Sequence, residues 1–161
     1  MPAVAQTPAV SDANASVAAV QTYLQGLRTL SAKFVQTAPD GTQVGGDFLL
    51  KRPGRMRFDY AAPVTDFIVA DGRFIYYYDG QMKETANAPI SQSLADFFLR
   101  EKITLSGDIK VTDVKTENGL LMVTVVQAKD AGAGSLTMGL TTAPRMQLKK
   151  WRINDAQGGI T

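Results

Sequence analysis

At residues 55–60 the chain reads RMRFDY, and this hexapeptide decides the fold. Two arginines and an aspartate alternate with Met56, Phe58 and Tyr60, so that every second side chain is apolar. A period of two is typical of a strand with one buried face, because successive strand side chains point to opposite sides of a sheet. Pro53-Gly54 precedes the segment and Ala62-Pro63 follows it, and both pairs favour turns. The sequence therefore predicts a strand of an antiparallel sheet.

Strands of the same kind are predicted on both sides of this segment, from residue 31 to 86 and again from 108 to 154. Two-residue turns at Asp71-Gly72, Asp79-Gly80 and Asn118-Gly119 join neighbouring strands as hairpins. Gly45-Gly46 interrupts an alternating segment and predicts a β-bulge or a bend. Together these segments predict a single antiparallel meander of about nine strands, which must curl because an open sheet of that width does not stay flat.

Two segments change from a period of two to helical spacing. Residues 14–30 carry apolar side chains at steps of three and four, namely Val17, Val20, Leu24 and Leu27, and Gly26 weakens the last turn. Residues 90–101 repeat the pattern with Leu94, Phe97 and Phe98. Each helix has one apolar face and needs a surface to cover. The predicted fold is α+β and mainly antiparallel β: a strongly curved, half-open β-barrel whose concave apolar face is covered by the helices.

The composition excludes several classes of function. The chain has 161 residues, with 17 Lys+Arg against 15 Asp+Glu, and this balance does not suit a dedicated nucleic-acid binder. It contains no His and no Cys, which excludes Ser-His-Asp nucleophile systems, zinc sites, haem ligation by His and disulfides. The residues left for enzyme chemistry are carboxylates, Lys, Tyr and Ser, so the composition favours binding over catalysis.

The N-terminal residues 1–13 differ in composition from the rest. They contain no Lys or Arg, and Ala3-Val4-Ala5 before Gln6 looks like the small-residue end of a signal cleavage site. We interpret this segment as a flexible leader or the remnant of a signal peptide, and residues 14–161 as a single domain. The chain contains no run of eighteen apolar residues.

Four stretches resemble one known family. They are LQGLRTL at 24–30 leading into AKFVQT at 32–37, GDFLLKRP at 46–53 followed by MRF at 56–58, FIVADGRFIYYY at 67–78, and LADFFL at 94–99. In this order they resemble the periplasmic outer-membrane lipoprotein carrier family, LolA. The resemblance covers most of the chain, from about Val17 to Trp151.

The resemblance implies a monomeric periplasmic carrier without cofactor or covalent chemistry, whose signal peptide has been removed. It would take acylated lipoproteins from an inner-membrane ABC-type release complex, shield their acyl chains, and pass them to an acceptor lipoprotein in the outer membrane. Members of the family run on through another strand, so a chain that stops at Thr161 is expected to lack its last C-terminal strand.

Arg52 is the first candidate functional residue. Without the resemblance, an arginine in a Lys-Arg-Pro turn reads as a solvated turn residue. The resemblance implies that Arg52 reaches a lid helix and donates hydrogen bonds to its backbone carbonyls, as a latch. The chemistry agrees, because a guanidinium offers five donors and helix ends offer unpaired carbonyls.

The apolar strand faces and the second helix supply the candidate acyl cavity. Its expected lining is Phe34, Phe48, Leu50, Met56, Phe58, Tyr60, Ile68, Tyr76, Leu94, Phe97 and Phe98, with Tyr78 as a further candidate. The simpler interpretation is that any of these side chains only forms core. Met and aromatic side chains suit a site that accepts variable chains.

Other interpretations stay open at this point. The chain could be an outer-membrane acceptor or a lipoprotein sensor of the same fold, a lipid- or glycan-active envelope enzyme, or a structural envelope module. The cluster Lys149, Lys150 and Arg152 is either a solvated strand face or a docking site for an acidic partner or an anionic membrane. Asp47 and Asp59 are expected to be isolated outward residues.

Overall fold

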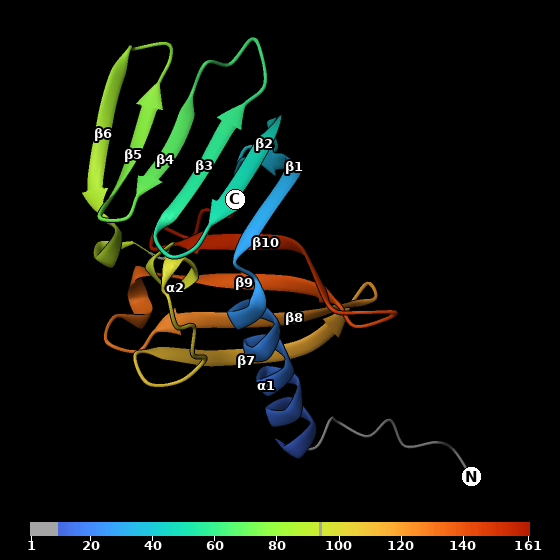
Figure 1. The fold of residues 1–161 in the computed structure, drawn as a ribbon. Coiled ribbons are helices and arrows are strands. Elements are labelled where there is room, and N and C mark those ends of the chain that lie inside the picture. The colour runs from blue at the N-terminus through green and yellow to red at the C-terminus, as the bar shows by residue number, and fades with distance from the viewer. Residues whose placement is uncertain (1–9, 94) are drawn as a thin grey trace.

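The computed structural model describes residues 10–93 and 95–161 (Figure 1). Helix α1 (Val10–Gly26) leads into six strands: β1 (Thr29–Thr37), β2 (Gln43–Lys51), β3 (Arg55–Tyr60), β4 (Phe67–Asp71), β5 (Phe74–Asp79) and β6 (Glu84–Pro89). The chain continues through the 3-10 turn η1 (Ile90–Gln92) and helix α2 (Ala95–Leu99). The last elements are β7 (Ile109–Glu117), β8 (Leu120–Gln127), η2 (Ala131–Ala133), β9 (Gly134–Thr141) and β10 (Gln147–Asp155).

The strands form two sheets. Strands β1 to β6 follow one another in a six-stranded sheet, and the other four form a sheet of order β10-β9-β8-β7. Every pair is antiparallel, as predicted, and neither sheet closes on itself, which agrees with an open half-barrel. The prediction of one continuous sheet is wrong, because β6 continues into η1 and α2 and does not pair with β7.

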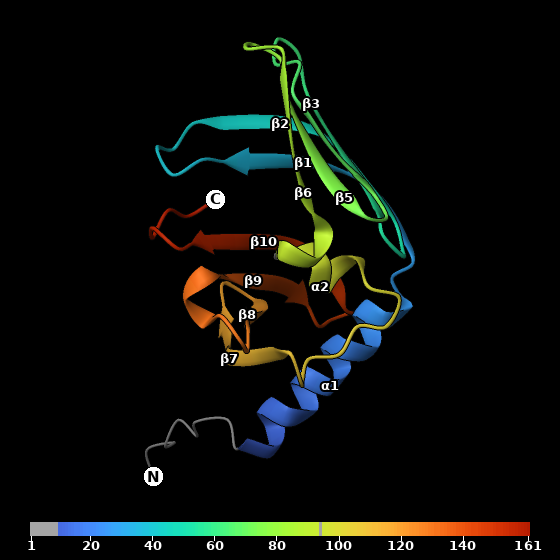
Figure 2. The ribbon, with the colours of Figure 1, turned by 90° about the vertical axis from the view of Figure 1, so that its left-hand side faces the viewer.

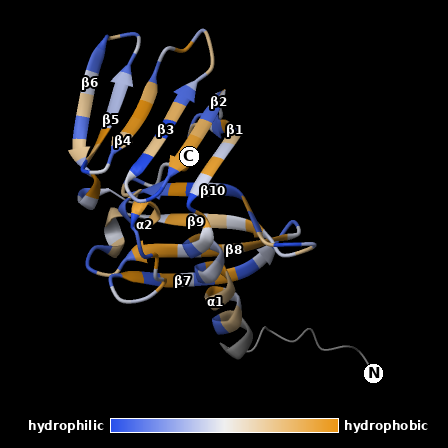
Figure 3. Cartoon of the chain, in the orientation of Figure 1, coloured by the Kyte–Doolittle hydropathy of each residue, from blue (hydrophilic) through white to orange (hydrophobic). Residues whose placement is uncertain are grey.

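The two helices take different places. In Figures 1 and 2, α1 runs across β7, β8 and β9, whereas α2 lies at the junction between the two sheets. Val20 and Leu24 of α1 are completely buried in the same cluster as Val123 and Leu140. Because the strands form two sheets, the helices divide the cover between them: α1 lies on the four-stranded sheet, and α2 lies at the junction. Figure 3 shows the apolar residues concentrated on β8 and β9, beneath α1.

Both helices are shorter at their C-terminal ends than predicted. Helix α1 ends at Gly26, and Thr29 already pairs with Lys51 in the sheet. Helix α2 holds only five residues, because Ser93 is extended (φ −115°, ψ 158°) and separates it from η1. Conversely, α1 begins at Val10, inside the predicted leader. No helix in the described part of the chain has the length and apolar character needed to cross a membrane.

Gly46 serves a close approach and not the predicted bulge. Strand β2 keeps a continuous register with β1 and β3 through this residue. A Cβ at Gly46 would lie 2.1 Å from the Asp59 carbonyl oxygen and 2.8 Å from the Phe34 ring. The glycine thus lets Phe34 lie flat across the sheet.

Candidate functional site

Arg52, in the turn between β2 and β3, connects the ends of both helices. Its Nη1 donates to the carbonyl oxygens of Leu24 (2.6 Å) and Leu27 (2.8 Å), at the C-terminal end of α1. Its Nε and Nη2 donate to the Arg100 carbonyl (3.0 and 2.8 Å), and Nη2 also to that of Glu101 (3.1 Å), just after α2. Of these acceptors, Leu24 lies in α1, and Arg100 and Glu101 directly follow α2.

The charge of Arg52 is buried without a carboxylate. The residue is only 5 % exposed, and all five hydrogen bonds of its side chain go to carbonyl oxygens. Burial lowers the pKa of Arg52, and the nearby positive charge of Arg28 lowers it further. Helix C-termini carry a partial negative charge that favours a cation. Each charge-assisted bond contributes about 1.5–3 kcal/mol, so together they hold the residues that follow α2 firmly to the end of α1.

The backbone of the same turn also holds α2. The Gly54 N–H donates to the Leu99 carbonyl at 2.8 Å, so Leu99, Arg100 and Glu101 are all bound by residues 52–54. Gly54 has φ +78°, and a Cβ there would lie 2.7 Å from the Cα of Gly72. Only glycine suits this position.

Residues 101–105, which follow α2, are attached to α1. The Gln25 side chain donates to the Glu101 carbonyl (3.2 Å) and accepts from the Ile103 N–H (2.7 Å). One helical turn earlier, Gln21 accepts from the Leu105 N–H (2.9 Å). Ile103 and Leu105 are buried between these bonds. This segment is fixed to the scaffold, whereas η1 and α2 are held by the backbone bonds Ile90 N–H to the Arg73 carbonyl and Gly54 N–H to the Leu99 carbonyl, and by apolar contacts.

Arg100 joins the end of α2 to the start of β7. Its guanidinium forms ion pairs with Asp96 (2.6 Å) and Asp108 (2.5 Å). The hydrogen bond from Arg100 holds the pKa of the Asp108 carboxyl below its usual value. These groups are partly exposed, so the ion pairs contribute less than the buried bonds of Arg52.

Aromatic rings fill the space beneath α2. Phe98 meets Trp151 of β10 edge-on (5.4 Å between ring centroids), and Trp151 meets Phe48 in the same way (5.4 Å). Phe48 lies against Phe58 (4.6 Å), and Phe34 extends the row at 5.3 Å from Phe58. A continuous row of rings thus runs from α2 into the six-stranded sheet.

The strand register places most predicted lining residues on one face, which we call the inner face. Phe48 pairs with Phe58, which pairs with Ile68, and Leu50 pairs with Met56. Phe34 and Tyr60 both pair with Gly46, which puts them on the same face. Phe97 and Phe98 of α2 are buried in the cluster that contains Phe48 and Leu50. Leu94 lies outside the described residues.

Tyr76 and Tyr78 lie on the opposite face. Ile68 pairs with Tyr77, whereas Tyr76 pairs with Val69 and Tyr78 with Phe67. Tyr77 therefore takes the inner position that was expected of Tyr76. It is 39 % exposed, and its hydroxyl donates to Asp66 at 2.6 Å, a bond that raises the pKa of Tyr77 to about 12.

Sequence reasoning missed Tyr77 and Trp151. Three consecutive tyrosines at 76–78 give no alternation from which to choose a face. Trp151 lies between charged neighbours, and the register shift between Leu148 and Lys150 breaks the period of two in β10. Its signal was that a lone tryptophan in a strand prefers a buried position.

The charged candidates lie away from the inner face. Lys149 and Lys150 are exposed, while Arg152 is half-buried. Asp47 and Asp59 are not isolated: Lys33 contacts Asp47 at 2.8 Å, and Arg57 contacts Asp59 at 2.7 Å.

Known proteins resemble this chain over most of its length. The family described as "Outer membrane lipoprotein carrier protein LolA" matches residues 25–161. The "Outer-membrane lipoprotein carrier protein" of Methylococcus capsulatus is 27 % identical over 70 % of this chain and 58 % of its own. Namesakes from Methylobacillus flagellatus and Leptothrix cholodnii are 25 % and 29 % identical, over 90 % and 88 % of this chain and 74 % and 69 % of their own. The matches thus span about three fifths to three quarters of these relatives. The relatives are named as carriers and not as enzymes, and the chain belongs to the LolA family of outer membrane lipoprotein carrier proteins.

Proposed function

We propose that this protein is a periplasmic carrier that binds the acyl chains of lipoproteins against the inner face of the six-stranded sheet. It would receive them from an inner-membrane ABC-type release complex and deliver them to an acceptor lipoprotein of the outer membrane. The observation that carries the proposal is Arg52, a buried cation that holds two helix ends over a row of aromatic rings. The family match from residue 25 to 161 supports the same role.

The acyl chains would displace α2. Phe98 contacts Trp151, and Trp151 contacts Phe48, so rings occupy the space nearest the inner face. An acyl chain that enters between Phe98 and Trp151 separates α2 from the sheet and breaks the two bonds of Arg52 to the Arg100 carbonyl. Residues 101–105 stay in place because Gln21 and Gln25 bind them to α1. The moving part is therefore residues 90–100, with its hinge beside Glu101.

A latch of this kind balances tight binding. Each buried CH₂ contributes about 0.8 kcal/mol, so several long chains in a dry site would leave too slowly for a carrier. Loading offsets part of this gain by breaking the bonds of Arg52, and closing recovers them when cargo leaves. A ligand shifts such an equilibrium only by its differential affinity for the two states.

The test of the latch is Arg52→Leu, with loading and release of a labelled lipoprotein measured separately. The variant lacks the bonds that favour closure, so uptake should stay intact or become tighter, and handoff to an acceptor should slow. Transfer at the parent rate would show that Arg52 is only a structural turn residue.

The test of the site is Phe58→Asp, which puts a charge on the inner face. A fluorescent fatty-acyl probe should bind the parent and bind this variant at least about tenfold more weakly. The matched control is Leu49→Asp, the same change on the opposite face of the adjacent strand β2. If Phe58→Asp does not fold, Ile68→Asp at a half-buried inner position replaces it. Equal binding by inner-face and control variants would refute the site.

A further inference from the structure

The face of the six-stranded sheet opposite Phe58, which we call the outer face, carries apolar side chains beside charged ones. The register places Leu49, Arg57, Val69 and Tyr76 in one row across β2 to β5. A neighbouring row holds Phe67 and Tyr78, whose rings stack at 4.9 Å. Leu49 is 47 % exposed and Phe74 38 %. Figure 1 looks onto this face, and no described helix lies on it. Exposed apolar patches of this kind mark interaction sites.

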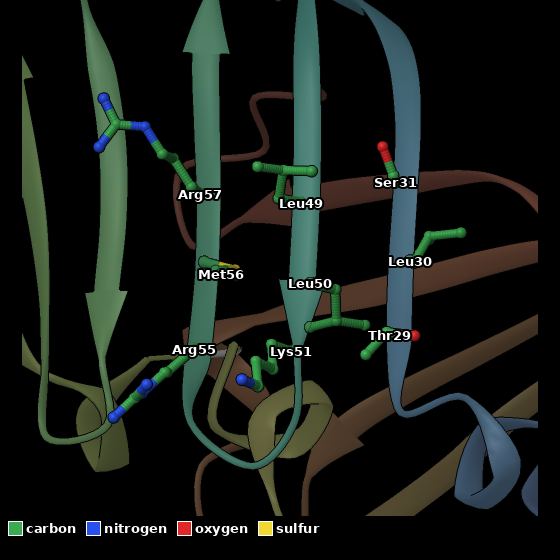
Figure 4. Close-up of a pocket in the computed structure, with 9 residues that line it drawn as sticks. All are labelled: Thr29, Leu30, Ser31, Leu49, Leu50, Lys51, Arg55, Met56 and Arg57. Atoms are coloured by element: carbon green, nitrogen blue, oxygen red, sulfur yellow. The ribbon is translucent and has the colours of Figure 1, made fainter.

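A recess in this face is lined by strands β1, β2 and β3. Its volume is about 450 Å³, and its lining residues are Thr29, Leu30, Ser31, Leu49, Leu50, Lys51, Arg55, Met56 and Arg57. Of these, Leu50 and Met56 belong to the inner face by register. Figure 4 shows Leu49 between Arg57 and Ser31, with Lys51 and Arg55 below them. The lining contains three cations and no carboxylate.

Two of these cations are available to a partner. Arg57 is bound to Asp59 and lies 5.1 Å from the Phe67 ring centroid, so its position is set by the sheet itself. Lys51 and Arg55 form no ion pair with any described residue, and both are exposed. Asp71 of β4 pairs with Arg55 of β3, but its carboxylate accepts hydrogen bonds from the backbone N–H groups of Arg73 and Phe74.

We propose that the outer face docks an acidic, aliphatic segment of a partner protein. Carboxylates of the segment would meet Lys51 and Arg55, and an aliphatic side chain would enter the recess beside Leu49. An acidic partner complements a lining that holds cations alone. A bilayer fits less well, because membrane insertion needs protruding apolar side chains, and Leu49 lies in a recess. The proposal does not depend on acyl binding, which uses the other face.

The test uses fluorescence anisotropy of a labelled peptide of alternating Glu and Leu, with a Lys and Leu peptide as the comparison. The parent should bind the acidic peptide, and added salt should weaken the complex. Lys51→Glu with Arg55→Glu should weaken binding at least about tenfold, and Leu49→Ser by about threefold. Lys110→Glu with Lys129→Glu is the matched control, because both lysines are exposed and lie in the other part of the fold. The control should bind within about twofold of the parent.

Each alternative outcome has a separate meaning. No binding of the acidic peptide, or equal losses in both charge-reversed variants, would overturn the proposal. Preferential binding to vesicles of anionic lipid, abolished by the Lys51 and Arg55 changes, would assign the face to a membrane and overturn it too. Phe58→Asp should leave peptide binding unchanged while it weakens the acyl probe. This variant therefore separates a failure of the docking face from a failure of the inner site.

Discussion

Met138 and Leu140 of the four-stranded sheet are completely buried, whereas Ile68 and Tyr77 on the inner face of the six-stranded sheet keep part of their surface exposed. The two sheets are covered differently. Helix α1, with 17 residues, lies across the four-stranded sheet, but only the five residues of α2 and Trp151 of the other sheet reach the base of the six-stranded one. The core of the four-stranded sheet is thus fully covered. The inner face of the six-stranded sheet stays partly exposed, and this is where we propose that a ligand binds.

The comparison predicts the largest loss of stability in the four-stranded sheet. Leu140→Ala removes a fully buried side chain beneath α1 and should lower the free energy of unfolding by about 2–5 kcal/mol. Ile68→Ala, at a half-buried position, should cost about 1 kcal/mol. Urea unfolding of both variants measures the difference. Equal losses would mean that the inner face is packed as tightly as the core.

Arg52→Lys should have the next largest effect. A lysine ammonium has all its donors on one nitrogen. Unlike the planar guanidinium, it cannot bind the carbonyls of α1 and those of the segment after α2 at the same time. We expect a loss of about 3 kcal/mol, because roughly two charge-assisted bonds are lost. Hydrogen exchange of residues 95–99 should also speed up in this variant, while exchange in β8 stays slow. Unchanged exchange in α2 would argue against a latch.

Asp108→Asn should have a smaller effect. The substitution removes the ion pair between Asp108 and Arg100. The Asp108 side chain is 52 % exposed, and ion pairs at such positions contribute about 0–1 kcal/mol. Thermal unfolding should show a slight decrease, and acyl-probe binding should not change. A large change in probe affinity would place Arg100, and not Arg52, at the centre of lid control.

Acid should slightly destabilise the end of the six-stranded sheet that carries the β3–β4 and β5–β6 connections. The Tyr77 hydroxyl and the Gly80 N–H bind the Asp66 carboxylate and hold its pKa below the value of the unfolded chain. Its contribution is therefore complete above about pH 4 and is lost as the pH falls through the lowered pKa. Asp66→Asn should be less stable than the parent at neutral pH by at most about 1 kcal/mol. The gap should narrow in acid, and a gap that widens below pH 4 would contradict the sign.

Local patterns in the sequence predicted the strands well because alternation and turn residues act over a few positions. RMRFDY forms β3, and Asn118-Gly119 forms a tight turn with positive φ at both residues. The division into two sheets could not be predicted, since it depends on how the chain from β6 to β7 crosses the core. The site was predicted only in part. Arg52 in a Lys-Arg-Pro turn looks solvated in the sequence, and its burial depends on carbonyls up to 49 residues away.

The most direct test of the carrier account uses Trp151, the single tryptophan of the chain. Its ring lies between Phe98 of the lid helix and Phe48 of the inner face, so any acyl chain that enters there must pass within contact distance. Fatty acids with bromine atoms on the chain quench tryptophan emission only by contact. The account predicts strong, saturable quenching of Trp151 in the parent, at least as strong quenching in Arg52→Leu, and weak quenching in Phe58→Asp. Emission that stays constant while the fatty acid binds would place the acyl site elsewhere and contradict the central claim.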